Sequence, residues 1–157
     1  MKKNRRLIHV WAGIPPKEED IGEVRVKVRL TNAADESNVR SGLIKPDQVR
    51  SVEIEALVDT GAVRCVIPIS IKEQLGLRTT SRRRAPYADG RSEEVDVTEP
   101  VRIELENRPT YEDCLVLGDQ VLIGQTALES TDLFVDCVGG RLVPNPAHPH
   151  AVVLGVL

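Results

Sequence analysis

Residues 56–62 read Ala-Leu-Val-Asp-Thr-Gly-Ala, an apolar run that stops at Asp59 and continues into a small hydroxyl residue, a glycine and an alanine. The preceding stretch, Val49 to Val58, alternates polar and apolar side chains, which predicts a strand with one face on a core. The motif therefore predicts a carboxylate buried at the end of a strand. A carboxylate in such a place contributes poorly to stability and is a candidate for catalysis.

A tight turn is the simpler interpretation of Asp-Thr-Gly. An Asp side chain at a turn caps backbone amides, and Gly supplies a positive φ. The surroundings argue against an ordinary surface turn, because a second apolar run, Cys65-Val-Ile-Pro-Ile69, follows closely. On the tripeptide alone, both interpretations stay open.

Composition limits the functional classes. The chain has 157 residues, 41% of them hydrophobic, a net charge of −3 and only four aromatic residues (one Trp, two Tyr, one Phe). This predicts one domain with an aliphatic core and gives no case for nucleic-acid or membrane binding. The three cysteines share no metal-like spacing, and we expect reduced thiols, no metal, no cofactor and a cytoplasmic protein without a signal peptide.

The rest of the chain reads as many short strands. Glu23 to Leu30 alternates charged and apolar residues without a fault, and the polar segment Thr31 to Gln48 is expected to be a long loop. Further strands are expected at 95–97, 101–105, 113–117 and 120–123, short helices at 71–77 and 124–130, and a hairpin of 133–138 with 141–143. The pattern predicts an all-β, closed or barrel-like domain with one or two short helices, of which 124–130 is the best candidate.

Two later motifs complete the set. Tyr87-Ala-Asp-Gly90 has polar flanks and an Asp-Gly pair, which favours a hairpin tip in solvent. Val121-Leu-Ile-Gly124 is a short apolar run that ends on a glycine directly before the predicted helix.

In this order, Leu57 to Ala62, the tip at Tyr87 to Gly90 and Leu122 to Gly124 resemble the motifs of retropepsin-like aspartic proteases, and most closely the stand-alone bacterial type. The resemblance covers residues 22–145 and leaves an N-terminal extension (1–21) and a C-terminal tail (146–157). It implies an all-β, closed acid-protease half-barrel with one short helix, functional as a homodimer. The family's glycine-rich tip is reduced here to Gly90 and carries a charged Asp89.

The resemblance also implies an activity and a set of site residues. Asp59 would be the catalytic carboxylate of an aspartic endopeptidase, and since the chain has one such motif, the second carboxylate must come from a second copy. The substrate would be an extended peptide bound as an added strand. Roles in supporting the Asp dyad and binding substrate fall to Thr60, Gly61, Ala62, Tyr87, Ala88, Asp89, Gly90, Ile123 and Gly124.

Alternatives remain for the function and for three segments. The chain could be a non-catalytic peptide-binding or assembly domain of the same fold, or an unrelated barrel with a chance turn. Arg82-Arg83-Arg84 is expected to be a solvated loop. The functional alternatives are a preference for acidic substrates and a nucleic-acid contact, and the latter lacks interleaved aromatic residues and an overall basic charge. His148 and His150 are too few for a metal site. The apolar end, Ala151 to Leu157, could be an edge or interface strand or could pack on its own domain.

Overall fold

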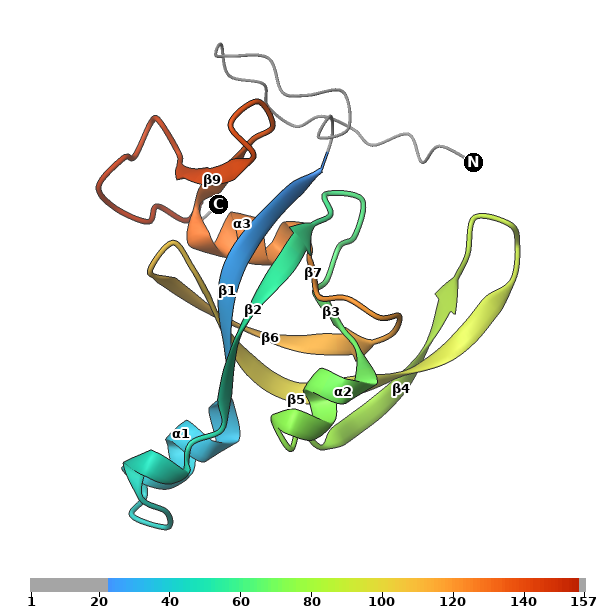
Figure 1. The fold of residues 1–157 in the computed structure, drawn as a ribbon, viewed down its shortest axis with the longest axis vertical. Coiled ribbons are helices and arrows are strands. Elements are labelled where there is room, and N and C mark those ends of the chain that lie inside the picture. The colour runs from blue at the N-terminus through green and yellow to red at the C-terminus, as the bar shows by residue number, and fades with distance from the viewer. Residues whose placement is uncertain (1–22, 156–157) are drawn as a thin grey trace.

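The computed structural model describes residues 23–155, and a six-stranded barrel forms the body of this part of the chain (Figure 1). The barrel closes because the first strand pairs with both the second and the fifth. Around the barrel the strands follow the order β1 (Val24–Asn32), β2 (Ser51–Val58), β7 (Leu122–Ile123), β3 (Val66–Ile67), β6 (Arg108–Val116) and β5 (Ser92–Leu105). The predicted closed all-β fold is confirmed.

Alternating side chains explain the first two strands. In β1 the residues from Val24 to Leu30 are alternately buried and exposed, as their sequence predicts. Strand β2 lies antiparallel to it, with Val24 opposite Val58. This pairing brings the end of β2, and so Asp59, to the same end of the barrel as the start of β1.

Strand β5 is longer than the sequence suggested. We expected two strands on either side of Pro100, but residues 92–105 form one strand with a bulge in its pairing to β6 between Val97 and Pro100. A bulge accommodates a proline, which cannot donate to a strand ladder. The first half of β5 pairs with β4 (Thr79–Pro86), and the two form a hairpin that projects from the barrel (Figure 1).

The three consecutive arginines lie in a strand, so the prediction of a loop for this segment is wrong. Arg82, Arg83 and Arg84 belong to β4, where their side chains are exposed. Their opposite neighbours across the pair are Asp96, Val95 and Glu94. Two of the three arginines thus face acidic partners, which explains how a strand with so many like charges is stable.

The segment Thr31 to Gln48, expected to be a loop, contains helix α1 (Ala33–Arg40) and the short 3-10 helix η2 (Pro46–Gln48). Asn32 begins α1, since its side-chain oxygen accepts a hydrogen bond from the Asp35 amide at 3.1 Å. The same side chain donates to the Leu75 carbonyl at 2.9 Å, next to the end of helix α2 (Ile69–Gln74). The helix was missed because its sequence has no apolar stripe.

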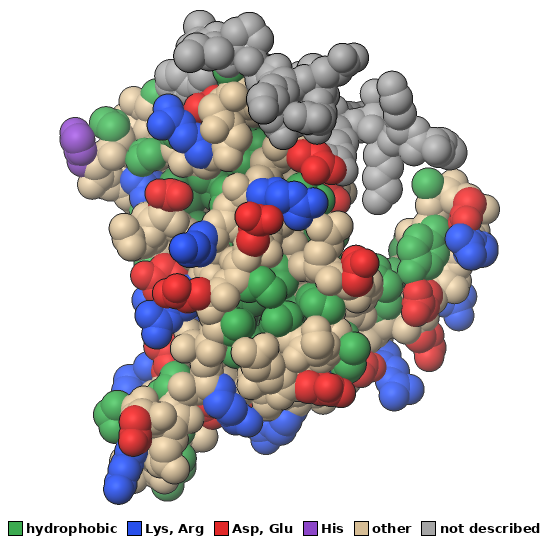
Figure 2. All heavy atoms as spheres, viewed as in Figure 1, with side chains coloured by type: hydrophobic (Ala, Val, Ile, Leu, Met, Phe, Trp, Pro, Cys, Tyr) green, Lys and Arg blue, Asp and Glu red, His purple; other side chains and the backbone are tan. Residues whose placement is uncertain are grey.

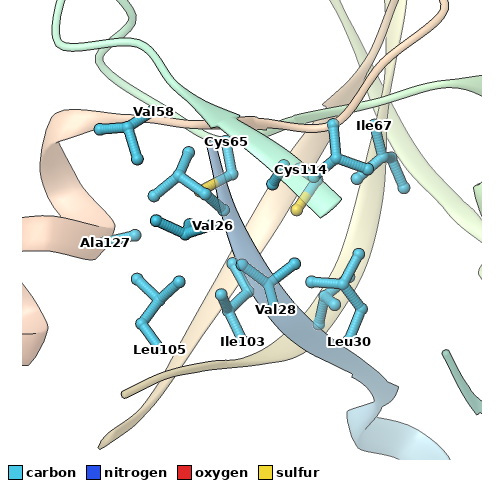
Figure 3. Close-up of a cluster of buried hydrophobic side chains, with 14 of the residues drawn as sticks. Val26, Val28, Leu30, Val58, Cys65, Ile67, Ile103, Leu105, Cys114 and Ala127 are labelled. Atoms are coloured by element: carbon cyan, nitrogen blue, oxygen red, sulfur yellow. The ribbon is translucent and has the colours of Figure 1, made fainter. Parts of the chain in front are cut away.

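The core is aliphatic, as the composition predicted. Figure 3 shows side chains of β1 and β5 in one cluster with the two cysteines from the neighbourhood of β3 and β6; its labelled members are Val26, Val28, Leu30, Val58, Cys65, Ile67, Ile103, Leu105, Cys114 and Ala127. Helix α3 (Gln125–Thr131) covers one side of the cluster through Ala127 and Leu128. All three cysteines are free thiols, two of them buried.

The C-terminal part forms the predicted hairpin and an irregular tail. Strands β8 (Leu133–Asp136) and β9 (Arg141–Pro144) pair as a separate two-stranded sheet. Residues 151–155 are exposed and form no strand within this chain, so the edge strand that was one of the alternatives for this segment does not form here. The predicted extension 1–21 lies outside the described residues. Among residues 23–155, no helix is long and apolar enough to span a bilayer.

Candidate active site

A tight turn of residues 59–62, here called the Asp59 turn, follows β2 directly. The Asp59 carbonyl accepts from the Ala62 amide at 3.1 Å, and its side-chain oxygen Oδ1 accepts from the Gly61 amide at 3.0 Å. The turn interpretation is therefore right about the capping carboxylate. The positive φ that this interpretation gave to the glycine is wrong, because Gly61 is not among the glycines with positive φ. A Cβ there would lie 3.2 Å from Asp59 Oδ1, so what the position requires is space.

Asp59 is half-buried, which corrects the expectation of a buried carboxylate. Thr60 and Ala62 are half-buried as well, and Gly61 is exposed. The reason is the place of the turn, since it projects past the last residues of β2 and β7 at the end of the barrel. Figure 2 shows that hydrophobic side chains gather in the middle of the visible face, with charged side chains around them. Asp59 is thus only partly covered by the described part of its own chain.

Strand β7 supports the start of the Asp59 turn through backbone hydrogen bonds. It lies between β2 and β3, parallel to β2, with Val58 beside Ile123. The Asp59 amide donates to the Ile123 carbonyl at 2.9 Å, and the Leu57 amide donates to the Val121 carbonyl at the same distance. Residues 59–65 consequently cross over the end of β7, and the two sequence motifs at Asp59 and Ile123 lie next to each other.

Gly124 and the start of α3 pack against the residues that leave the Asp59 turn. A Cβ on Gly124 would lie 2.6 Å from the Arg64 carbonyl oxygen and 2.8 Å from that of Val63, both backbone atoms. The amides of Gln125 and Thr126 donate to the carbonyls of Ala62 and Val63 at 2.9 and 3.0 Å. The first turn of a helix has spare N–H groups, and here the chain that leaves the Asp59 turn accepts two of them.

Residues 63–65, here called the exit of the turn, have polar contacts that the sequence did not reveal. Arg64 pairs with Asp113 of β6 at 2.7 Å. Burial pushes the pKa of Asp113 upward, but the hydrogen bond from Arg64 and the charges of Arg64 and Arg83 outweigh it and lower the pKa. Glu112 binds the Cys65 amide at 2.7 Å. Both contacts depend on the parallel pairing of β3 with β6, which no local pattern announces.

The predicted hairpin tip forms at residues 87–90, between β4 and β5. The Tyr87 hydroxyl donates to Glu93 at 2.5 Å, which raises the pKa of Tyr87, and the Arg91 guanidinium lies 5.7 Å from the centre of the Tyr87 ring. Asp89 accepts from Arg91 at 2.7 Å, so polar contacts order a tip that has only Gly90 as a glycine. The tip stands apart from the Asp59 turn in this single chain (Figure 1).

Comparison with known proteins identifies the family of the chain. The family described as aspartyl protease matches residues 46–128, just over half of the chain, and this span includes the Asp59 turn, the hairpin tip and Gly124. Among solved structures, EIAV protease complexed with the inhibitor HBY-793 is 24% identical, with 49% of this chain and 75% of that chain covered and a TM-score of 0.39. No curated protein matches. The chain belongs to the aspartyl protease family, which confirms the resemblance drawn from its motifs.

Proposed function

We propose that the protein is an aspartic endopeptidase that acts as a homodimer, with Asp59 of each copy forming the catalytic pair. The observation that carries the proposal is a single, half-buried carboxylate on a turn held at both ends by backbone hydrogen bonds. Aspartic proteases work with a pair of carboxylates that share one proton, and the sequence has one Asp-Thr-Gly motif. A second copy placed across a two-fold axis supplies the other.

The chemistry follows from two carboxylates that share one proton. At a separation of about 3 Å both cannot ionise cheaply, so the pair titrates as a unit. The ionised member takes a proton from a water molecule, whose oxygen attacks the peptide carbonyl carbon, while the protonated member donates to the carbonyl oxygen. The tetrahedral intermediate then collapses, the C–N bond breaks, and the leaving nitrogen takes up a proton.

The proposal assigns roles to other residues as well, and their place in the fold supports these roles. Gly61 is exposed at the top of the turn, where a bare backbone admits a substrate strand, and Thr60 and Ala62 support the pair from either side of it. Ile123 and Gly124 fix the turn from below. The tip residues Tyr87, Ala88, Asp89 and Gly90 would close over an extended peptide. The functional domain would span residues 22–145.

The first experiment compares the wild type with Asp59→Asn on a library of unstructured peptides, from acidic to neutral pH. The wild type should cleave and Asp59→Asn should not, while both sediment as dimers, because the amide keeps the shape and removes the ionisable group. Asp47→Asn, an exposed residue of η2 at the opposite end of β2, is the matched control and should cleave normally. A dimer that binds peptides without cleaving them would instead indicate the non-catalytic alternative.

Mixing the two chains tests whether the site is shared. After exchange at equal concentrations, about one quarter of random dimers contain two wild-type chains. If both Asp59 residues are needed, activity per total chain should fall to about one quarter of the wild-type value, whereas a site complete in one chain would leave about one half. An activity near one half, or a protein that stays monomeric while cleaving, would exclude the shared site.

A further inference from the structure

Glu112 is a half-buried carboxylate of β6 that links two elements near the Asp59 turn. Its Oε1 accepts from the Cys65 amide at 2.7 Å, and its Oε2 accepts from the Thr126 hydroxyl at 2.8 Å. Cys65 ends the exit of the turn, and Thr126 lies in the first turn of α3. One side chain therefore joins the chain that leaves Asp59 to the helix that packs beneath it.

The Cys65 amide needs this partner. Cys65 is 1% exposed and precedes the short strand β3, while its own carbonyl accepts from Leu115 at 3.1 Å. A buried N–H without an acceptor is costly, and a carboxylate is a stronger acceptor than a neutral oxygen. Removing Glu112 would leave the amide unsatisfied and free the backbone to move.

Thr126 completes a closed set of contacts. Its amide donates to the Val63 carbonyl at 3.0 Å, and its hydroxyl lies 2.9 Å from the same oxygen. Val63, Thr126, Glu112 and Cys65 thus form a ring of hydrogen bonds around Arg64. At the other end, the bond from the Asp59 amide to Ile123 fixes the start of the turn. Between these two anchors lie residues 60–62.

We propose that Glu112 is a positioning residue, which fixes the exit of the Asp59 turn against α3 and so holds Asp59 in register with its copy across the dimer axis. This inference rests on the proposed protease function. Glu112 has no role in the proton transfers, and its effect on the reaction passes through the backbone of residues 63–65. Because small misplacements of a reacting group are costly, loosening this backbone should reduce turnover more than substrate binding.

The test uses Glu112→Ala and Glu112→Gln in the full chain, assayed on the best-cleaved peptide of the library. Glu112→Ala should lower kcat roughly ten- to a hundred-fold with little change in KM. Glu112→Gln should keep most of the activity, because its carbonyl can accept from Cys65 and its amide can donate to the Thr126 hydroxyl. In parallel, hydrogen exchange of the Cys65 amide should be fast in Glu112→Ala and slow in Glu112→Gln.

Matched variants separate this role from general destabilisation. Glu53→Ala removes an exposed carboxylate of β2 and should match the wild type in both measurements. Thr126→Ser should be tolerated and Thr126→Val should not, with the effects of Thr126→Val and Glu112→Ala less than additive. The proposal is overturned if Glu112→Ala keeps Cys65 protected, or if Glu112→Gln loses as much turnover as Glu112→Ala. A wild type without peptidase activity would refute the proposed function, while exchange at Cys65 still decides the hydrogen-bond link.

Discussion

The amide of Asp59 donates to the carbonyl of Ile123 at 2.9 Å, and this bond joins two motifs that are far apart in the sequence. Because β7 has only two residues, the bond to Ile123 and its neighbour from Leu57 to Val121 make up much of the support for the turn. Geometry at Asp59 is thus set by residues 121–126 as much as by the Asp-Thr-Gly motif itself.

Replacing Gly124 with alanine should damage both stability and activity. The new Cβ would meet backbone atoms of Arg64 at 2.6 and 2.7 Å, and backbone cannot give way as a flexible side chain would. We expect a loss of about 1–3 kcal/mol in the free energy of unfolding, measured by urea titration, and a clear fall in peptide cleavage. Gly155→Ala, where a Cβ meets nothing within 4 Å, is the control. A Gly124→Ala variant as stable as this control would contradict the close approach.

Local patterns predicted the elements whose side chains alternate or follow a turn signal. The alternation in β1 and β2, the tip at Tyr87 to Gly90 and the helix after Gly124 all formed close to their predicted bounds. In each case the residues that decide the element are neighbours in sequence. The half-burial of Asp59 was missed because it depends on where β7 ends, a property of the tertiary pairing.

The missed elements are those stabilised from outside their own sequence. Helix α1 has no apolar stripe, and it forms because Asn32 and Asp35 anchor it to Leu75 and Arg50. Strand β4 reads as a charged loop, and it forms because β5 supplies Asp96 and Glu94 opposite its arginines. Glu112 looks like any surface carboxylate until β3 and β6 pair. Such contacts between distant residues leave no period in the sequence.

The ion pair between Asp35 and Arg50 should make stability depend on pH. Asp35 accepts from the Arg50 amide at 3.0 Å and from its Nε and Nη2 at 2.9 Å, and the hydrogen bonds from the Arg50 side chain lower the pKa of Asp35 below 3.8. Because the folded-state pKa is depressed, the stabilisation is present above about pH 4 and is lost as the pH falls through the lowered value. Asp35→Asn should cost about 1–3 kcal/mol at neutral pH and progressively less in acid.

Urea titrations of the wild type and Asp35→Asn at several pH values would measure this difference. Peptide cleavage at neutral pH should be retained by the folded variant, since α1 and Asp59 lie at opposite ends of β2. A stability difference that stays constant from neutral pH into acid would argue against the charge as its source.

Asp132 should hold the C-terminal tail to the end of α3. Its side chain accepts from Asn145 at 2.9 Å and from the Val153 amide at 3.0 Å, and it lies 2.7 Å from His148 Nδ1. These contacts lower the pKa of Asp132 to about 2, and the hydrogen bond from Asn145 contributes most. The stabilisation is therefore present above about pH 4 and disappears as the pH falls towards 2.

Asp132→Asn is a clean test because Asp132 has a left-handed backbone, with φ of 53°, which asparagine tolerates. The variant should expose residues 145–153 to proteolysis at neutral pH while the barrel stays folded by circular dichroism. Asp119→Asn, in the turn before β7, should leave the tail protected. Equal cleavage of the tail in both variants would show that the carboxylate of Asp132 does not hold it.

Thiol labelling should distinguish the three cysteines in the native protein. Burial raises the pKa of Cys65 to about 12 and that of Cys114 well above its ordinary value, and both residues are at most 1% exposed. The thiolate is the reactive form, so neither should react with a maleimide at neutral pH, whereas the half-buried Cys137 should react slowly. Mass spectrometry should find one label in the native sample and three labels in the urea-unfolded sample. Fast native labelling at Cys65 would mean that the exit of the Asp59 turn opens, and Glu112→Ala should increase labelling at this residue alone.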